Sequence, residues 1–168
     1  MYTNKPDMTR IYLALGSNVG NSKRHFARAL ELLKDQVSDI VASPYYVTRA
    51  VGYTEQADFV NGVIQGETTL TPRELLAYVK AIEKEVGRVE RFRWGPREID
   101  IDIIFYGNDI INEPGLHIPH ERFRERDFVL RPLCDIAPGF IDPVTRQRVD
   151  RLLDELPPAQ QSIKSKSS

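Results

Sequence analysis

The sequence lacks the features that mark secreted, membrane-spanning and general nucleic-acid-binding proteins. Its 168 residues include one cysteine, Cys134, so no internal disulfide is possible, which fits a reducing compartment. No apolar run approaches the roughly 20 residues of a membrane helix, and the first ten residues contain no apolar signal segment. With 23 basic and 24 acidic side chains, the chain has no basic surplus for neutralising nucleic-acid phosphates. We therefore expect a monomeric cytoplasmic protein that binds neither membranes nor nucleic acids.

The composition predicts one compact domain of mixed α and β structure. Hydrophobic residues make up 41% of the chain and charged residues 28%, enough for a core and a solvated surface. Strands and helices are expected to alternate, and the gaps between strands predict a largely antiparallel sheet with helices packed on its faces. We expect a single catalytic domain over residues 1–156. The polar residues 157–168 lack an apolar pattern and are expected to be a disordered tail.

Several segments have patterns that predict particular elements. The clearest is a helix that begins with Thr71 as N-cap, Pro72 at the first position and Glu74 at the third, and that ends at Gly87. Ser22 is expected to cap an earlier helix that begins near residue 23. Apolar and β-branched patterns predict strands at 11–15, 39–48, 59–68 and 99–106, and a further helix at 129–136.

The predicted strand at 99–106 contains a pair of carboxylates. Asp100 and Asp102 are two residues apart, so their side chains point to the same face of the strand, while the neighbouring Ile99, Ile101 and Ile103 point to the other face. Two carboxylates held this close repel each other unless a cation lies between them. Magnesium prefers such oxygen ligands and completes its shell with substrate phosphates and water. The alternative is an ordinary amphipathic strand with its acidic face in water.

An arginine-rich loop just before the pair favours a phosphate site over that alternative. Arginine presents a planar fork that matches phosphate oxygens, and Glu90 is the only acidic residue among the four arginines of the loop. Cations beside a metal-binding carboxylate pair suit a triphosphate. The loop arginines are Arg88, Arg91, Arg93 and Arg97, and the Trp94-Gly95-Pro96 segment fixes the loop before the last of them.

Residues 116–128 contain two histidines and three arginines. His117 and His120 flank a proline, and an imidazole can donate to phosphate oxygens. A zinc site lacks ligands, because there is one cysteine and His25 is far away in sequence. A plain surface turn with a structural histidine remains the alternative here.

A second set of residues suggests a site for a heteroaromatic ring. Asn61 lies inside a predicted strand, where an unpaired amide is costly to bury, so it could read the hydrogen-bonding edge of a ligand. Phe59, on the same face, could stack on the ring. The loop at Ser17 lacks the full Walker pattern, so we do not interpret it as a P-loop.

In this order, these pieces resemble the 6-hydroxymethyl-7,8-dihydropterin pyrophosphokinase family of folate biosynthesis. The most specific motif is RWGPREIDIDII at residues 93–104. It is preceded by YLALGSN at 12–18 and FVN at 59–61, and followed by IPH at 118–120, ERDFVL at 125–130 and IAP at 136–138. The resemblance covers roughly residues 10–140, nearly the whole domain.

The resemblance implies a ferredoxin-like α+β fold and a magnesium-dependent transferase, which moves pyrophosphate from ATP to the hydroxymethyl group of the pterin and releases AMP. It implies that Asp100 and Asp102 hold two magnesium ions. The implied triphosphate contacts are Arg88, Arg97, His120 and Arg126, and the implied nucleotide contacts are Glu83, Trp94, Ile103 and His117. The implied pterin contacts are Thr48, Val51, Gly52, Phe59, Asn61, Trp94 and Phe128, with Phe59 and Phe128 on either side of the ring.

Some positions depart from the family pattern. Glu121 follows the second histidine, and an acid near the nucleotide either weakens ATP binding or points away. Gly115 stands where some members carry a basic residue, and either Arg91 or Arg93 could be the second arginine of the loop. Two other functions fit parts of the sequence. One is a different magnesium-dependent phosphoryl or nucleotidyl transferase, and the other is a non-catalytic ferredoxin-like binding module, which would not need the carboxylate pair.

Overall fold

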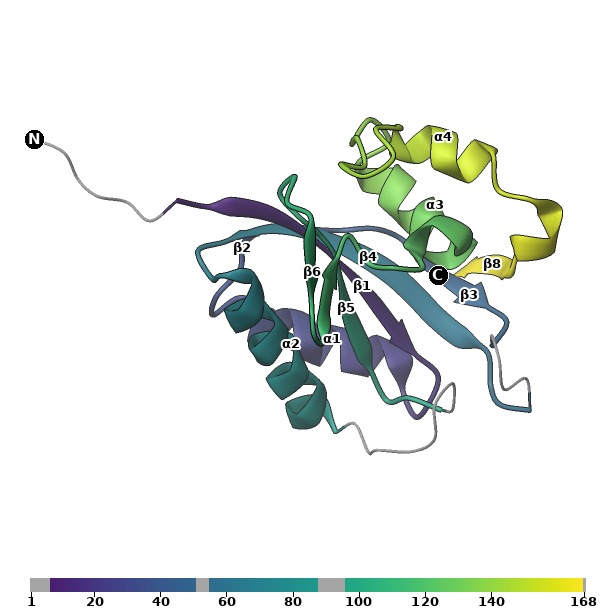
Figure 1. The fold of residues 1–168 in the computed structure, drawn as a ribbon. Coiled ribbons are helices and arrows are strands. Elements are labelled where there is room, and N and C mark those ends of the chain that lie inside the picture. Colours follow the sequence, from purple (N-terminus) through teal and green to yellow (C-terminus); the bar gives the residue numbers. More distant parts are fainter. Residues whose placement is uncertain (1–6, 51–54, 88–95, 168) are drawn as a thin grey trace, which may run out of the picture.

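A six-stranded antiparallel sheet with helices on both faces forms the fold (Figure 1). The computed structural model describes residues 7–50, 55–87 and 96–167. The strands are β1 Thr9–Ser17, β2 Ser38–Ala42, β3 Tyr45–Thr48, β4 Phe59–Thr68, β5 Asp100–Tyr106, β6 Ile111–Glu113, β7 Leu116–Ile118 and β8 Ile163–Ser167. The helices are α1 Ser22–Leu33, α2 Pro72–Val86, α3 Asp127–Ile136 and α4 Val149–Asp154, with short 3₁₀ turns η1 Phe123–Glu125 and η2 Pro158–Gln160.

The strand order confirms the predicted ferredoxin-like α+β class. The sheet runs β5-β1-β4-β3-β8, β2 pairs with the other half of β4, and every pairing is antiparallel. With β2 and β3 counted as two pieces of one strand, the first part of the chain follows the β-α-β-β-α-β succession of this class. The strands β6 and β7 form a separate hairpin beside β5.

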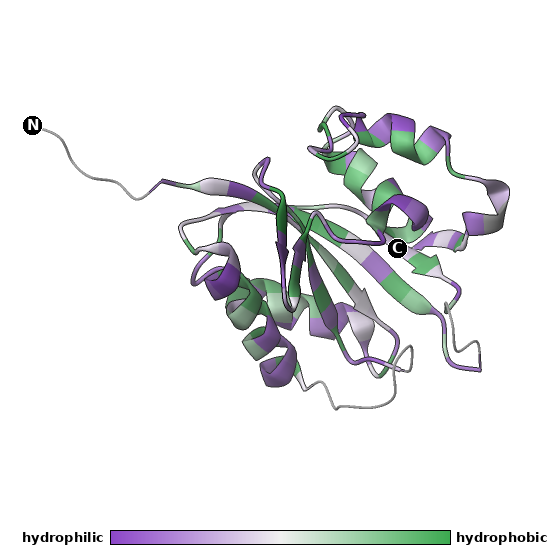
Figure 2. Cartoon of the chain, viewed as in Figure 1, coloured by the Kyte–Doolittle hydropathy of each residue, from purple (hydrophilic) through white to green (hydrophobic). Residues whose placement is uncertain are grey.

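Two hydrophobic cores lie on opposite faces of the sheet, and β1 contributes to both. Because side chains alternate along a strand, Ile11, Leu13 and Leu15 enter the core under α1 and α2, whereas Tyr12 enters the core under α3. Figure 2 shows the apolar side of α1 and α2 turned towards the sheet and the polar side turned away. No described helix is long and apolar enough to cross a membrane.

Two predicted boundaries differ from the structure. The N-cap of α1 is Asn21, whose side chain accepts the Arg24 N–H, and Ser22 is the first helical residue. The predicted strand at 39–48 is split into β2 and β3 at Pro44, which has no N–H to donate to a ladder. Ser43 fills the gap, because its hydroxyl accepts the Val63 N–H.

The tail at 157–168, expected to be disordered, is instead structured over much of its length. After η2 the chain returns to the sheet, and β8 pairs with β3 along its outer edge. The strand could not be predicted from its polar composition, because its pairing depends on backbone hydrogen bonds and on partners distant in sequence.

The predicted helix start at Thr71 is confirmed in detail. The Thr71 side chain accepts the Glu74 N–H, the Glu74 carboxylate accepts the Thr71 N–H, and Gly87 ends the helix with a φ of 115°. This capping box fixes the start of α2, the helix that packs beside β5.

Replacing Thr71 by alanine should lower the free energy of unfolding by about 1 kcal/mol, because the Glu74 N–H loses the hydroxyl that accepts it and the capping box is broken. Urea denaturation measures the change. Thr69→Ala is the matched control, since Thr69 is exposed and should change stability by less than about 0.5 kcal/mol. Equal effects of the two substitutions would contradict the capping role.

Candidate functional site

The carboxylate pair lies on β5, which forms one edge of the sheet. Asp100 pairs with Gly16 of β1 and Asp102 pairs with Ala14, so both carboxylates belong to the face that α3 covers. Ile101 and Ile103 are buried on the opposite face. The predicted alternation along this strand is therefore confirmed.

The surroundings of Asp102 favour the presence of a cation. Its side chain retains 32% of its accessible surface and lies in a pocket wall. Burial, followed by the charge of Asp100, raises the pKa of Asp102 to about 7, while Lys80 and Arg126 oppose the rise. A divalent cation between the two carboxylates would remove the repulsion that opposes ionisation.

The set of donors fits magnesium better than a metal enclosed by protein ligands. Within residues 7–50, 55–87 and 96–167, no three or more His, Cys, Asp or Glu side chains gather as a metal site. A structural zinc ion needs four protein ligands. Magnesium is commonly held by one or two carboxylates together with substrate phosphates and water, which matches what Asp100 and Asp102 offer.

The carboxylate of Glu83, on α2, forms a hydrogen bond to the backbone of β5. Its side chain is only 3% exposed, and Oε2 accepts the Ile101 N–H at 2.7 Å. The bonded amide belongs to the residue between the two aspartates. Glu83 is therefore placed to orient the carboxylate pair, and it is not among the residues that line the neighbouring pocket.

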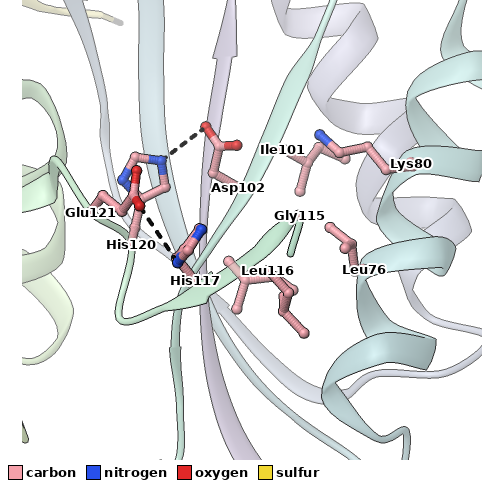
Figure 3. A pocket seen from close by; sticks show the side chains of 10 residues that line it. Leu76, Lys80, Ile101, Asp102, Gly115, Leu116, His117, His120 and Glu121 are labelled. Atoms are coloured by element: carbon pink, nitrogen blue, oxygen red, sulfur yellow. Dashed lines mark ion pairs between the residues drawn. The ribbon is translucent and has the colours of Figure 1, made fainter. Parts of the chain in front are cut away.

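A pocket of about 190 Å³ adjoins the pair between α2, β5 and β7 (Figure 3). It unites three sequence-predicted residues, Ile103, His117 and His120, with Asp102. The other lining residues are Leu76, Lys80, Ile101, Gly115, Leu116 and Glu121. Lys80 is the notable addition, because its Nζ lies 3.4 Å from the Glu83 carboxylate and its side chain is 44% exposed. No pattern in the sequence predicts a role for Lys80, since a lone lysine on a helix usually faces solvent.

His120 presents a neutral imidazole with a defined tautomer. Burial, followed by the charge of Arg126, lowers its pKa to about 4. The Nδ1 atom accepts the Arg122 N–H at 3.1 Å, so Nε2 carries the proton in the neutral ring. That Nε2 lies 4.0 Å from Asp102 Oδ2. The ring therefore directs a hydrogen-bond donor towards the carboxylate and the space beside it.

Glu121 and His117 form a pair at the rim of the pocket. Glu121 Oε1 lies 3.5 Å from His117 Nδ1, and both side chains are substantially exposed (Figure 3). The acid that departs from the family pattern thus has a partner at the rim. The His117 side chain is 41% exposed, against 24% for His120, so His120 is the more enclosed of the two histidines.

Arg126 approaches the carboxylates from the start of α3. Burial lowers its pKa, and the charges of Asp102 and Asp100 oppose that shift. Its guanidinium carbon also lies 5.5 Å from the centre of the Phe128 ring. Arg126 thus connects the acidic face of β5 with one of the predicted ring-stacking residues.

Asn18 clamps three segments around the site. Its Oδ1 accepts the Arg97 N–H at 2.8 Å, while its own N–H and that of Val19 donate to the Arg97 carbonyl. Its Nδ2 donates to Gln56 Oε1 and the Ala57 carbonyl, both at 2.8 Å. No local pattern in the sequence predicts this role of Asn18, because its side-chain partners lie 38 or more residues away.

Three of the residues predicted for ring binding, Thr48, Phe59 and Asn61, lie where β3 and β4 pair, beside β1. Asn61 is buried, and its Nδ2 donates to Thr48 Oγ1 at 2.7 Å. Its Oδ1 lies beside Gly16, where an added Cβ would come within 2.8 Å of it. Phe59 pairs with Thr48 at the start of β4 and is partly exposed, as is Phe128. Four other predicted site residues, Val51, Gly52, Arg88 and Trp94, lie outside the described residues, as do Arg91 and Arg93.

Comparisons with known proteins agree on one family. The family model of 7,8-dihydro-6-hydroxymethylpterin-pyrophosphokinase matches residues 12–138. The chain is 44% identical over 140 residues to a 2-amino-4-hydroxy-6-hydroxymethyldihydropteridine pyrophosphokinase of Aquifex aeolicus, covering 83% of this chain and 88% of that protein. A Pseudomonas aeruginosa protein of the same name is 40% identical over 131 residues, covering 77% and 81%.

Longer relatives contain the matched region as one part. A folate synthesis bifunctional protein of Arabidopsis thaliana is 50% identical over 128 residues, which cover 75% of this chain and 26% of that protein. The crystal structure of Plasmodium falciparum HPPK-DHPS matches with a TM-score of 0.74 at 16% identity, over 91% of this chain and 45% of that one. That structural likeness supports the fold.

The Asn18 clamp predicts a difference between two substitutions. Asn18→Asp keeps the oxygen that accepts the Arg97 N–H, whereas Asn18→Ala removes it. Hydrogen exchange resolved at the Arg97 amide should therefore be about tenfold faster in the alanine variant than in the aspartate variant. Both substitutions remove the Nδ2 donor, so each is the other's control for the loss of the bonds to Gln56 and Ala57. Equal protection of Arg97 in the two variants would contradict the clamp.

Proposed function

Because the chain belongs to the 7,8-dihydro-6-hydroxymethylpterin pyrophosphokinase family, we propose that the acidic face of β5 is the centre at which its two substrates meet. The chain is a pyrophosphokinase of folate biosynthesis, so it transfers pyrophosphate from ATP to the pterin hydroxymethyl group and releases AMP. This proposal rests on the meeting of Asp102 and His120 in the wall of the pocket of Figure 3. The charge of Arg126 acts on Asp102 from the start of α3.

ATP is proposed to occupy the pocket between α2, β5 and β7. Leu76, Ile103 and Leu116 supply apolar surface for the nucleoside, and Lys80 supplies a positive charge. Asp102 and His120 line the same pocket, so the triphosphate would extend along the acidic face. Both ends of a nucleotide, one apolar and one anionic, thus find a complementary lining.

Asp100 and Asp102 would hold two magnesium ions at this face. Bound there, magnesium would neutralise charge on the transferring phosphates. The side chains of the protein contribute fixed donors: Arg97 and Arg126 offer guanidinium groups, and the neutral His120 offers its Nε2–H. Donors positioned before the reaction stabilise the charge that develops at the transferring group. Arg88 is proposed for the same role.

The pterin is proposed to bind where β1, β3 and β4 meet. Asn61 is held by Thr48 and keeps Oδ1 as an acceptor for a ring N–H. Phe59 and Phe128 would cover the two faces of the ring, with Val51, Gly52 and Trp94 completing this side. The hydroxymethyl oxygen attacks the β-phosphorus while the bond from that phosphorus to the oxygen of AMP breaks. Asp100 is the group proposed to orient the hydroxyl or to receive its proton.

Two further properties remain predictions from the composition of the sequence. These are a monomeric state and a cytoplasmic location. Sedimentation analysis tests the first.

The reaction is tested by incubating the chain with ATP, magnesium and 6-hydroxymethyl-7,8-dihydropterin and separating the nucleotides. AMP is the expected product. ADP would instead indicate a different phosphoryl transferase.

Substituting Asp100 or Asp102 separately with alanine should lower kcat by about two orders of magnitude or more, since each loss removes a proposed metal ligand. Steady-state turnover at saturating magnesium measures the change. Asp109→Ala is the control, because Asp109 is exposed just after β5. Near-normal turnover by either site variant would contradict the assignment of magnesium to this pair.

Lys80→Met should raise the KM for ATP about tenfold and leave the KM for the pterin unchanged, because a positive charge is lost from the nucleotide pocket only. Lys84→Met, one turn later on the exposed side of α2, provides the control. A changed pterin KM, or no change in either KM, would place Lys80 outside the nucleotide site.

A further inference from the structure

The strand β8, near the end of the chain, lies beyond the residues that the family model matches. The family model matches residues 12–138, whereas β8 begins at Ile163. The intervening residues pass through α4 and η2 before the chain returns to the sheet. In Figure 1, β8 lies along the outer edge of β3, next to the start of α3. The segment 162–167 is called the strap below.

The strap is fastened by a buried carboxylate. Asp127, the first residue of α3, is only 4% exposed. Its Oδ2 accepts the Ser162 N–H at 2.7 Å and the Ile163 N–H at 3.0 Å, and its Oδ1 accepts the Ser162 hydroxyl at 2.5 Å. Three donors from two adjacent residues thus converge on one side chain. Hydrogen bonds to a charged acceptor are stronger than neutral ones, so this contact is a firm attachment point.

Besides its pairing along β3, the strap makes contacts on the proposed pterin side. Thr48 pairs with Ile163, and the Arg49 N–H donates to the Ser162 carbonyl at 3.0 Å. Lys164 Nζ lies 2.7 Å from Asp58 Oδ2, immediately before Phe59. The strap therefore touches both ends of the segment 49–58, at Arg49 and at Asp58.

Asp127 also connects the strap to Phe128, which is one of the proposed pterin contacts. Phe128 follows Asp127 in α3, and Thr48 is bonded to Asn61. The strap thus joins the backbone segments that carry Thr48, Phe59 and Phe128, three of the proposed pterin contacts. The pairing of β3 with β8 is irregular between Val47 and Thr48, next to the position where Asp127 binds Ser162 and Ile163.

We propose that the strap positions the pterin-binding side of the site and that Asp127 is the positioning residue that fastens it. This inference rests on the proposed pterin site. Asp127 acts through the backbone of Ser162 and Ile163 and has no contact with the reacting atoms. Its loss leaves three donors without their acceptor, which frees β3 and the start of β4 to shift relative to α3. The nucleotide pocket is lined by other elements and should be unaffected.

The test compares substitutions in the full-length chain. Asp127→Ala removes the acceptor, and Asp127→Asn keeps one carbonyl oxygen for a backbone N–H. Ile163→Pro removes a donor from the strap and leaves Asp127 in place, so it separates the strap from any effect on α3. Asp150→Ala is the matched control: Asp150 is likewise an acid in the first turn of a helix, but it pairs with Arg148 at the surface.

Three measurements read the outcome: steady-state kinetics with each substrate varied, direct pterin binding by fluorescence titration, and hydrogen exchange at the Arg49 amide. Asp127→Ala and Ile163→Pro should raise the KM and Kd for the pterin about tenfold, with the KM for ATP within about twofold of wild type. Asp127→Asn should give a smaller increase. Exchange at Arg49 should be faster in both disrupting variants and unchanged in Asp150→Ala.

The outcomes separate this inference from the proposed function. If the wild-type chain releases AMP and the disrupting variants bind the pterin normally, the positioning role is overturned and the pyrophosphokinase function stands. Equal increases in the KM for ATP and in the KM for the pterin would also overturn the positioning role, because they would indicate a general loss of folding. A wild-type chain that binds no pterin would contradict the proposed pterin site itself.

Discussion

The pairing register of β1 is the constraint on which the whole site depends. Gly16 lies opposite Asn61 of β4 on one side and opposite Asp100 of β5 on the other. Residues directly opposite in a sheet face the same side, and neighbouring strands are about 4.8 Å apart. The backbone positions that carry the amide proposed for the pterin and the carboxylate proposed for magnesium are therefore about 10 Å apart, across a residue without a side chain. A shift of one residue would turn Asp100 and Asp102 to the wrong face.

Features that depend on neighbours in sequence could be predicted from the sequence. The shared face of Asp100 and Asp102 follows from the alternation of a strand, and the start of α2 follows from Thr71, Pro72 and Glu74. The antiparallel α+β class followed from the order of these patterns. The motif around the carboxylates and its order with the flanking motifs identified the family, because specific chemistry restricts residue types more than packing does.

Features that depend on distant partners could not be predicted. The strand β8 has a polar sequence, and its place is determined by pairing with β3 and by Asp127, 35 residues before Ser162. Lys80 became part of the site only because α2 packs beside β5. The tautomer of His120 depends on the backbone of Arg122. In each case the residue type allowed several roles, and the tertiary structure selected one of them.

The bond between Glu83 and the Ile101 N–H has a second consequence, for self-association. An edge strand presents a row of unpaired backbone groups, which another chain can use to extend the sheet and begin an aggregate. The site needs β5 at the edge, because a ligand must reach the carboxylates from the side. Glu83 occupies one of those backbone donors from within the same molecule, and the adjacent carboxylates add like charges that repel a second copy. The edge of β5 can therefore bind a small anionic ligand together with its cations, while pairing with a strand of another chain is disfavoured.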